Sequence, residues 1–386
     1  MLSLARNRRL RRAAVATFAL LAITTLWTVL EYETTREHAL PLDFLKQYKM
    51  DNPDTHALAP APSLSAIESI CRASNFPVYV TTQKRKVYDL VLLSTELDWL
   101  EIRLNTLSPY VDYFVIVESP TTFQGRPKPL WLQDDWTRFS PFHSKIIHRV
   151  VPDGSPSRYI WDHETWLRNS MLREVFPGLV GTDAEAAEGD VLVVSDMDEI
   201  IRPEAMLVLR YCDFPARLTL RSDFYYYSFQ WRHRGGAWAH PEATVYRGEE
   251  TLLPNSLRQG LLDEGWAPSA FWRRWRDRAS LANAGWHCSS CFATVAEMRT
   301  KLHSFSHQNW DTKENRNAEV MMERVREGRD LFGRVDQVYE RVEREDMDLP
   351  GYVLEQNEAQ GRFKYLLDRD GRDAGFEDWE TVVRED

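Results

Sequence analysis

Hydrophobic and polar positions change their spacing repeatedly along the chain from residue 87 onward. Nearly unbroken runs of aliphatic and aromatic residues occupy Val87–Leu93, Tyr113–Glu118 and Val191–Ser195, and a similar run covers 146–151. Runs of this length and composition are typical of strands that are buried on both faces of a sheet. We therefore expect four central strands in these segments.

The segments between and after these strands carry apolar residues at helical spacing. The first strand is followed by a leucine repeat that begins near Thr95-x-x-Asp98, a pattern that resembles a helix-capping box. Residues 162–176 also fit a helix, and two later helices are expected at 314–327 and 330–344. Alternating strands and helices predict an α/β fold with a mostly parallel sheet covered on both faces.

The strand at Val191–Ser195 ends in a cluster of carboxylates at Asp196, Asp198 and Glu199. Side chains two positions apart on an extended backbone point the same way, so Asp196 and Asp198 are expected to converge on one cation. Carboxylate oxygens suit Mg²⁺ or Mn²⁺, which keep coordination positions open for substrate phosphates. The pattern predicts a metal that holds a diphosphate, with a plain acidic turn as the alternative.

Other carboxylates follow the first two strands along the chain. Ligands of open α/β sheets bind beyond the carboxyl ends of the strands. Glu96 and Asp98 after the first strand, and Glu118 at the end of the second, should therefore share one rim with Asp196 and Asp198.

The N-terminal segment has the pattern of a membrane anchor. Several arginines within residues 1–12 precede residues 13–30, a stretch of 18 residues without a charge. This length just spans a bilayer, and the arginines favour a cytoplasmic N-terminus, although a cleaved signal peptide is the alternative. Residues 31–86 are polar and contain prolines, so we expect a stem that precedes a domain covering 87–367, while the acidic tail at 368–386 is expected to be solvated.

The composition excludes one class of partner and suggests another. A net charge of −10 leaves no basic face for nucleic acid. The 14 Trp, 15 Tyr and 17 Phe residues offer surfaces on which sugars could stack, although most aromatic residues belong to cores.

Four segments together resemble glycosyltransferase family 17, whose members add the bisecting N-acetylglucosamine (GlcNAc) to N-glycans. They include Ser195-Asp-Met-Asp-Glu-Ile200 and Gly285-Trp-His-Cys-Ser-Ser-Cys-Phe292, with Lys301 downstream. The other two are residues 88–105 and 114–130, and a weaker similarity covers 349–367. The resemblance spans roughly residues 87–367.

The resemblance implies a specific fold, reaction and location. The fold would be a nucleotide-sugar-binding, Rossmann-like domain of the glycosyltransferase A type, held in the Golgi membrane by a type II anchor with the catalytic domain in the lumen. The reaction would move GlcNAc from UDP-GlcNAc, with inversion, to the 4-hydroxyl of the core β-mannose of an N-glycan. A transferase of the same family with another acceptor is an alternative.

The resemblance also suggests roles for individual residues. Mn²⁺ or Mg²⁺ at Asp196 and Asp198 would stabilise the charge on departing UDP. The base that takes the proton of the acceptor hydroxyl is sought among Glu199, Asp223 and Glu264. Candidate contacts to the donor are Glu96, Asp98, Glu118, Lys128, Trp286, His287 and His307.

The Cys288-x-x-Cys291 motif permits two interpretations. With His303 and His307 it approaches the spacing of a zinc finger. The alternative is a disulfide, either between Cys288 and Cys291 or with Cys71 and Cys212, and we favour it because the chain lacks a basic reading helix.

Three other functional classes share features with this chain. A phosphatase of the haloacid-dehalogenase type also ends a strand in Asp-x-Asp, but Ile200 stands where Thr or Val is usual. A glycosidase would use paired carboxylates without a metal. A membrane-anchored lectin would bind glycans through the aromatic residues between Tyr225 and Trp231 without turnover.

Overall fold

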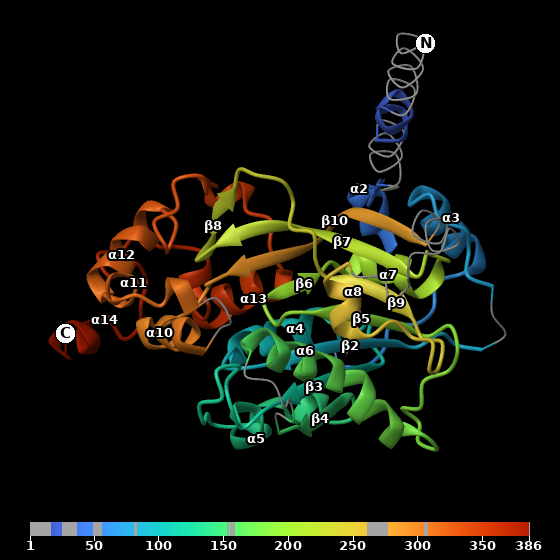
Figure 1. Cartoon of the computed structure of the whole chain (residues 1–386), viewed down its shortest axis with the longest axis horizontal. Coiled ribbons are helices and arrows are strands. Elements are labelled where there is room, and N and C mark those ends of the chain that lie inside the picture. Colours follow the sequence, from blue (N-terminus) through green and yellow to red (C-terminus); the bar gives the residue numbers. More distant parts are fainter. Residues whose placement is uncertain are drawn as a thin grey trace, which may run out of the picture.

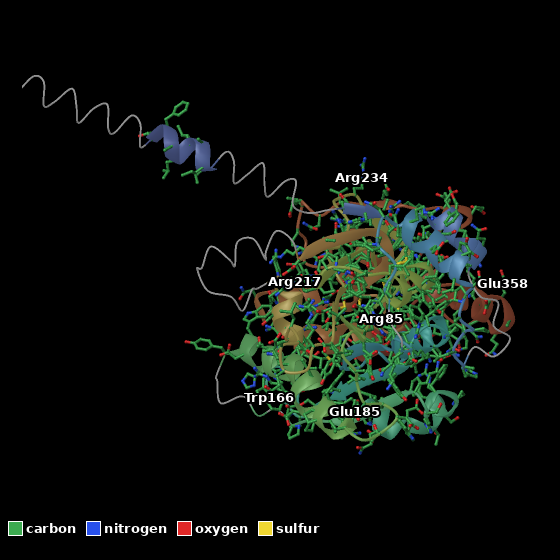
Figure 2. The ribbon with its side chains drawn as sticks, turned by 90° about the vertical axis from the view of Figure 1, so that its right-hand side faces the viewer. Arg85, Trp166, Glu185, Arg217, Arg234 and Glu358 are labelled. Atoms are coloured by element: carbon green, nitrogen blue, oxygen red, sulfur yellow. A yellow bond between two sulfur atoms is a disulfide. The ribbon has the colours of Figure 1, made fainter. Side chains whose placement is uncertain are left out.

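The structure is a computed structural model, and it describes residues 17–24, 37–48, 56–80, 83–152, 154, 159–260, 277–304 and 308–385. Of the expected membrane anchor, only residues 17–24 are described, as a short helix with exposed side chains (Figure 2). Among the described residues, no helix has both the length and the apolar character needed to cross a membrane. Glu264 and His307 lie outside the described residues.

One sheet of eleven strands runs through the described part of the chain (Figure 1). The main path of the sheet has the order β1-β10-β7-β9-β5-β2-β3-β4, with β6, β8 and β11 paired at its side. The strands are β1 (Glu37–Ala39), β2 (Val87–Leu93), β3 (Tyr113–Glu118), β4 (Ile146–Val150), β5 (Val191–Ser195), β6 (Glu199–Ile201), β7 (Arg217–Tyr226), β8 (Ser228–His233), β9 (Glu242–Val245), β10 (Arg278–Ser289) and β11 (Tyr339–Arg341).

The sheet is mixed, so the prediction of a mostly parallel sheet is wrong for its second half. Strands β5, β2, β3 and β4 run parallel to one another, as expected. Strand β9, however, runs antiparallel to both β5 and β7. The connection from β7 to β8 is Tyr227 alone, at a φ of 65°, and so short a link joins only antiparallel strands.

Helices cover both faces of the parallel strands, as predicted. One core layer joins the sheet to α4 and α7, and another joins it to α6 and the turns that follow it. The helices are α2 (Leu42–Leu45), α3 (Leu64–Ala73), α4 (Leu97–Leu107), α5 (Trp131–Asp134), α6 (Ile160–Ser170), α7 (Pro203–Tyr211), α8 (Pro254–Arg258), α10 (Val295–Ser304), α11 (Lys313–Arg316), α12 (Ala318–Glu327), α13 (Gly351–Gln360) and α14 (Trp379–Glu385).

Helix α4 forms where its leucine repeat predicts it, but the predicted capping box does not form. Glu96 is the residue at the helix N-terminus, and no side chain caps the first turn. The Glu96 carboxylate instead accepts hydrogen bonds from the backbone N–H groups of Ser94 and Thr95, at 3.1 and 2.8 Å. A short turn, in which Glu96 binds the backbone of the two residues before it, therefore takes the place of the predicted capping box.

The predicted helix at 330–344 is wrong. The Asp330 carboxylate accepts hydrogen bonds from the backbone N–H groups of Phe332 and Arg334, which closes a turn around Gly333 at a φ of 73°. A strand, β11, follows this turn and pairs antiparallel with β8. An aspartate that binds its own backbone in this way favours turns over helices.

Residues that were expected to form a stem pack against the main body of the fold. Strand β1 pairs in parallel with β10, and α3 joins the core through Ile70 and Cys71. A disulfide links Cys71 to Cys212 at the end of α7. Arg85, labelled within the body in Figure 2, donates hydrogen bonds to the carbonyls of Gly189, Leu209 and Cys212.

The C-terminal segment is not solvated as predicted. Arg369 is fully buried and donates hydrogen bonds to the carbonyls of Tyr227, Phe292 and Ala374. Phe376 is also buried, in a core that α14 shares with α10 and α12 (Figure 1). The prediction considered only the acidic composition of this segment, which also contains regularly spaced apolar side chains that pack into the core.

Candidate active site

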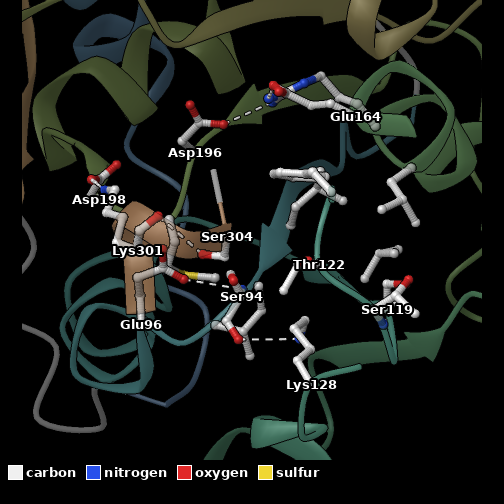
Figure 3. Close-up of a pocket in the computed structure, with 18 of the residues that line it drawn as sticks. Ser94, Glu96, Ser119, Thr122, Lys128, Glu164, Asp196, Asp198, Lys301 and Ser304 are labelled. Atoms are coloured by element: carbon white, nitrogen blue, oxygen red, sulfur yellow. Dashed lines mark hydrogen bonds and ion pairs between the residues drawn. The ribbon is translucent and has the colours of Figure 1, made fainter. Parts of the chain in front are cut away.

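A cavity of about 310 Å³ opens beyond the carboxyl ends of β2, β3 and β5. Its walls come from the turns after these strands and from α6, β10 and α10. Figure 3 shows Asp196, Asp198 and Lys301 on one side and Ser119, Thr122 and Lys128 on the other. The position matches the strand-end rim at which the sequence placed a ligand site.

The turn that bears the two aspartates folds back onto β10. Strand β6 pairs antiparallel with β10, so that Glu199 lies opposite His287, and the N–H of Cys288 donates to the carbonyl of Asp198 at 3.1 Å. Gly285 permits this contact, because a Cβ atom there would lie 2.6 Å from the carbonyl oxygen of Ile200. The Gly285-Trp-His-Cys motif thus brings His287 to Asp198.

Arg103 of α4 also fixes the turn that bears the two aspartates. Its guanidinium is fully buried and donates two hydrogen bonds to the carboxylate of Asp89 on β2, at 2.5 and 2.6 Å. It also donates to the carbonyls of Asp196 and Glu199, at 3.2 and 2.8 Å. The buried ion pair between Arg103 and Asp89 therefore fixes the backbone between Asp196 and Glu199.

Asp196 is held by two arginines. Its Oδ1 accepts a hydrogen bond from Arg168 of α6 at 2.9 Å, and its Oδ2 accepts one from Arg258 of α8 at 2.5 Å. Burial raises the pKa of Asp196, but the two guanidiniums outweigh it and keep the pKa well below its ordinary value. The side chain is 41% exposed and lines the cavity.

Asp198 has different partners. Lys301 of α10 donates a hydrogen bond to its Oδ2 at 3.0 Å, and Nε2 of His287 lies 3.7 Å from its Oδ1. Burial lowers the pKa of Lys301, but Asp198 and Glu96 together raise it above its ordinary value, so the amine stays charged. Burial lowers the pKa of His287, which favours the neutral imidazole that metals bind.

The two aspartates therefore point to separate cationic groups. No group of three or more His, Cys, Asp or Glu side chains suited to a metal occurs in the described parts of the chain. Asp198 and His287 nevertheless form a carboxylate and imidazole pair on the cavity wall, and Nδ1 of this buried imidazole has no hydrogen-bond partner. This donor set fits a divalent ion that takes its remaining ligands from substrate and water.

Glu199, a candidate base, is fully buried. Its carboxylate accepts hydrogen bonds from the N–H of Asp196 at 2.8 Å and from Nε1 of Trp238 at 2.7 Å. Both of its oxygens also accept hydrogen bonds from Arg258. In this arrangement Glu199 positions the aspartate turn, while its role as base stays a prediction.

Three of the predicted donor contacts line the cavity, namely Glu96, Lys128 and His287. Glu118 is fully buried below the rim, where it accepts hydrogen bonds from the N–H groups of Leu132 and Gln133 and from His148. These contacts indicate a structural role for Glu118, which binds backbone N–H groups at the start of α5.

The remaining predicted residues lie outside the cavity lining. Asp98 pairs with Arg138, and Asp223 pairs with both Arg202 and Arg232. The guanidinium of Arg202 lies over the ring of Trp286, with its central carbon 4.2 Å from the ring centroid. Glu264 and His307 fall outside the described residues.

Sequence reasoning missed several residues of the cavity wall. Arg168 and Glu164 form an ion pair at a spacing of four residues on α6, a helical signal that the sequence did contain. Trp161 of the same helix is 48% exposed at the cavity, and Trp238 lies beside His287 with ring centroids 4.6 Å apart. Nothing in the local sequence of Arg258 indicates its position.

The Cys288-x-x-Cys291 motif forms a disulfide, one of the two arrangements that the sequence left open. The zinc interpretation is wrong, because paired sulfurs supply no thiolate ligands. His303 instead contacts Asp311 at 3.0 Å.

Comparison with known proteins agrees with this geometry. A family model described as glycosyltransferase family 17 matches residues 12–371. A human protein named beta-1,4-mannosyl-glycoprotein 4-beta-N-acetylglucosaminyltransferase is 26% identical over 310 residues, which cover 74% of this chain and 55% of the human protein. The rat and mouse proteins of the same name are 26% and 25% identical over 315 residues, covering 75% of this chain and 56% of each relative.

This chain thus spans about half the length of the curated relatives it matches. The family model, in contrast, covers nearly the whole chain, including the segment before β2 that packs on the body. The chain therefore belongs to glycosyltransferase family 17.

Proposed function

We propose that this chain transfers GlcNAc from UDP-GlcNAc to the 4-hydroxyl of the core β-mannose of N-glycans. The observation that carries the proposal is the placement of Asp196, Asp198 and Lys301 in one cavity at the carboxyl ends of parallel strands. The names of the similar mammalian proteins support the sugar and the acceptor.

The two sides of the cavity suit the two ends of a UDP-sugar. The side formed after β2 and β3 combines apolar Leu93 and Val117 with polar Ser94 and Ser119, as a nucleoside requires. The opposite side carries the charged groups of Asp196, Asp198 and Lys301, which suit a diphosphate. The donor would therefore lie across the strand ends, with its sugar toward α6 and β10.

A divalent ion, Mn²⁺ or Mg²⁺, is part of the proposal. Asp198 and His287 would hold the ion, which would supply Lewis-acid stabilisation of the negative charge on departing UDP. Asp196 is fixed by Arg168 and Arg258 and would orient the donor by accepting hydrogen bonds from its hydroxyl groups. Trp161, which is half exposed at the cavity, would offer a stacking surface to the acceptor sugar.

Location in the Golgi membrane, with the catalytic domain in the lumen, completes the proposal. The uncharged segment at 13–30, preceded by arginines, supports a type II anchor. A fusion of the full chain to a lumen-sensitive reporter would test this orientation.

The activity is tested by measuring UDP release from purified protein with several UDP-sugars and a panel of N-glycans, with and without Mn²⁺. We expect turnover with UDP-GlcNAc and a glycan that carries the core β-mannose. Asp198→Asn should reduce the rate by roughly 100-fold or more, because metal stabilisation of a leaving group contributes several kcal/mol. Asp336→Asn, at an exposed aspartate far along the chain, serves as the matched control.

Two results would contradict the proposal in different ways. Glycan binding without release of UDP from any donor would favour the lectin alternative. Full activity in the presence of a chelator would remove the divalent ion from the proposal and leave the transfer reaction standing.

A further inference from the structure

Lys301 has an unusual place among the cations of the cavity. It lies on α10, which follows the Cys288–Cys291 disulfide, and its ammonium group reaches Asp198 from a helix that is 103 residues away in sequence. The ammonium lies 5.3 Å from the ring centroid of Phe292, which supports its position. The side chain is 25% exposed, and it faces the cavity (Figure 3).

The other cations near the aspartates are more tightly engaged. Arg168 is shared between Glu164 and Asp196, at 2.8 and 2.9 Å, and is almost fully buried. Arg258 donates to both Asp196 and Glu199 and is also buried. Lys301, by contrast, makes one hydrogen bond to the part of the chain that the structure describes, although its ammonium has three donors.

We propose that Lys301 binds the diphosphate of the donor, and that without donor it occupies the carboxylate of Asp198. The proposal rests on the function proposed above and assigns a role within the same site. A lysine on a flexible four-carbon stem can exchange a carboxylate for a phosphate without moving its helix. Arg258 could not do so without leaving the fully buried carboxylate of Glu199 without its guanidinium, whereas Asp198 would pass from Lys301 to the divalent ion.

This exchange has a consequence for the divalent ion. While Lys301 neutralises Asp198, the carboxylate is a weaker ligand for a cation, because the ammonium already holds Oδ2 and repels a second positive charge. When the diphosphate draws Lys301 away, both oxygens of Asp198 become available beside His287. Donor and divalent ion should therefore each strengthen the binding of the other.

The test measures binding in the full chain, so that it does not depend on turnover. Calorimetry would follow UDP in the presence of a chelator, and electron paramagnetic resonance would follow Mn²⁺ in the absence of UDP. The variants are Lys301→Met, which keeps the length of the side chain, and Lys301→Arg, which keeps its charge. Lys313→Met is the matched control at an exposed lysine, and thermal unfolding would show that each variant folds.

For Lys301→Met we expect two opposite changes. The affinity for UDP without metal should fall roughly tenfold, the size of losing one hydrogen bond between charged groups. The affinity for Mn²⁺ without UDP should rise, because Asp198 is then free of its competitor. The mutual strengthening of UDP and Mn²⁺ binding should be smaller than in the unmodified chain, while Lys301→Arg should retain UDP binding.

The outcomes separate this proposal from the one it rests on. Unchanged UDP and Mn²⁺ affinities in a folded Lys301→Met variant would overturn the role of Lys301 and leave the transferase function intact. Loss of both affinities together would also overturn it, because it would make Lys301 merely a support for the site. Failure of the unmodified chain to bind UDP would overturn both proposals.

Discussion

Replacing Arg103 by methionine tests how the aspartate turn is held. The guanidinium has no exposed surface and forms two short hydrogen bonds with Asp89, which is also fully buried. Methionine fills a similar volume but leaves the Asp89 carboxylate buried without its partner. Breaking a buried ion pair in this way costs about 3–5 kcal/mol, a large part of the ~5–15 kcal/mol that stabilises a typical domain.

A second variant separates stability from function. In the double variant Asp89→Leu with Arg103→Met no unpaired charge remains, and apolar replacements of buried ion pairs are often neutral. We therefore expect the double variant to regain most of the lost stability. The carbonyls of Asp196 and Glu199 still lack their donor, however, so the turn should remain poorly fixed and UDP should bind roughly tenfold more weakly.

Urea unfolding would measure the free energies, and calorimetry would measure the affinity for UDP. A loss below about 1 kcal/mol in Arg103→Met would refute the buried-pair argument, since even a typical neutral hydrogen bond contributes that much. Recovery of UDP binding together with stability in the double variant would show that Arg103 acts through stability alone.

Three further predictions concern other parts of the molecule. Burial raises the pKa of Glu242 to about 8 from an ordinary 4.5, so the folded protein keeps a proton that the unfolded chain releases. The free energy of unfolding should therefore fall as the pH rises from about 4.5 to about 8, and Glu242→Gln should remove this fall in urea titrations at several pH values. Trp161→Ala should raise the KM for the glycan acceptor about two- to tenfold, and a change in the KM for the donor instead would contradict its stacking role. Replacing Cys71 and Cys212 by alanine removes a disulfide between residues that are 141 positions apart. This should lower the free energy of unfolding by about 3–5 kcal/mol, which thermal unfolding would show as a lower Tm. An unchanged Tm would mean that the packing of α3 alone holds this segment.

The central strands were predictable because their signal is local. Strands β2, β3 and β5 have the bounds that their apolar runs indicate, since a strand covered on both faces needs apolar side chains at most positions. The prediction of a helix at 330–344 was wrong for an equally local reason. Asp330 and Gly333 favour a turn, although the spacing of the apolar residues there fits a helix. The direction of β9 depends on chain connections that periodicity does not record.

By itself the sequence determined that a buried strand ends in Asp196 and Asp198 and that the chain resembles one glycosyltransferase family. It did not determine what each carboxylate meets. Arg168, Arg258 and Lys301 reach the two aspartates from 28, 62 and 103 residues away, and only the packing of α6, α8 and α10 around the sheet brings them there. Strand-end chemistry follows from neighbouring residues, whereas the pairing of charges in a cavity follows from distances that only the folded chain defines.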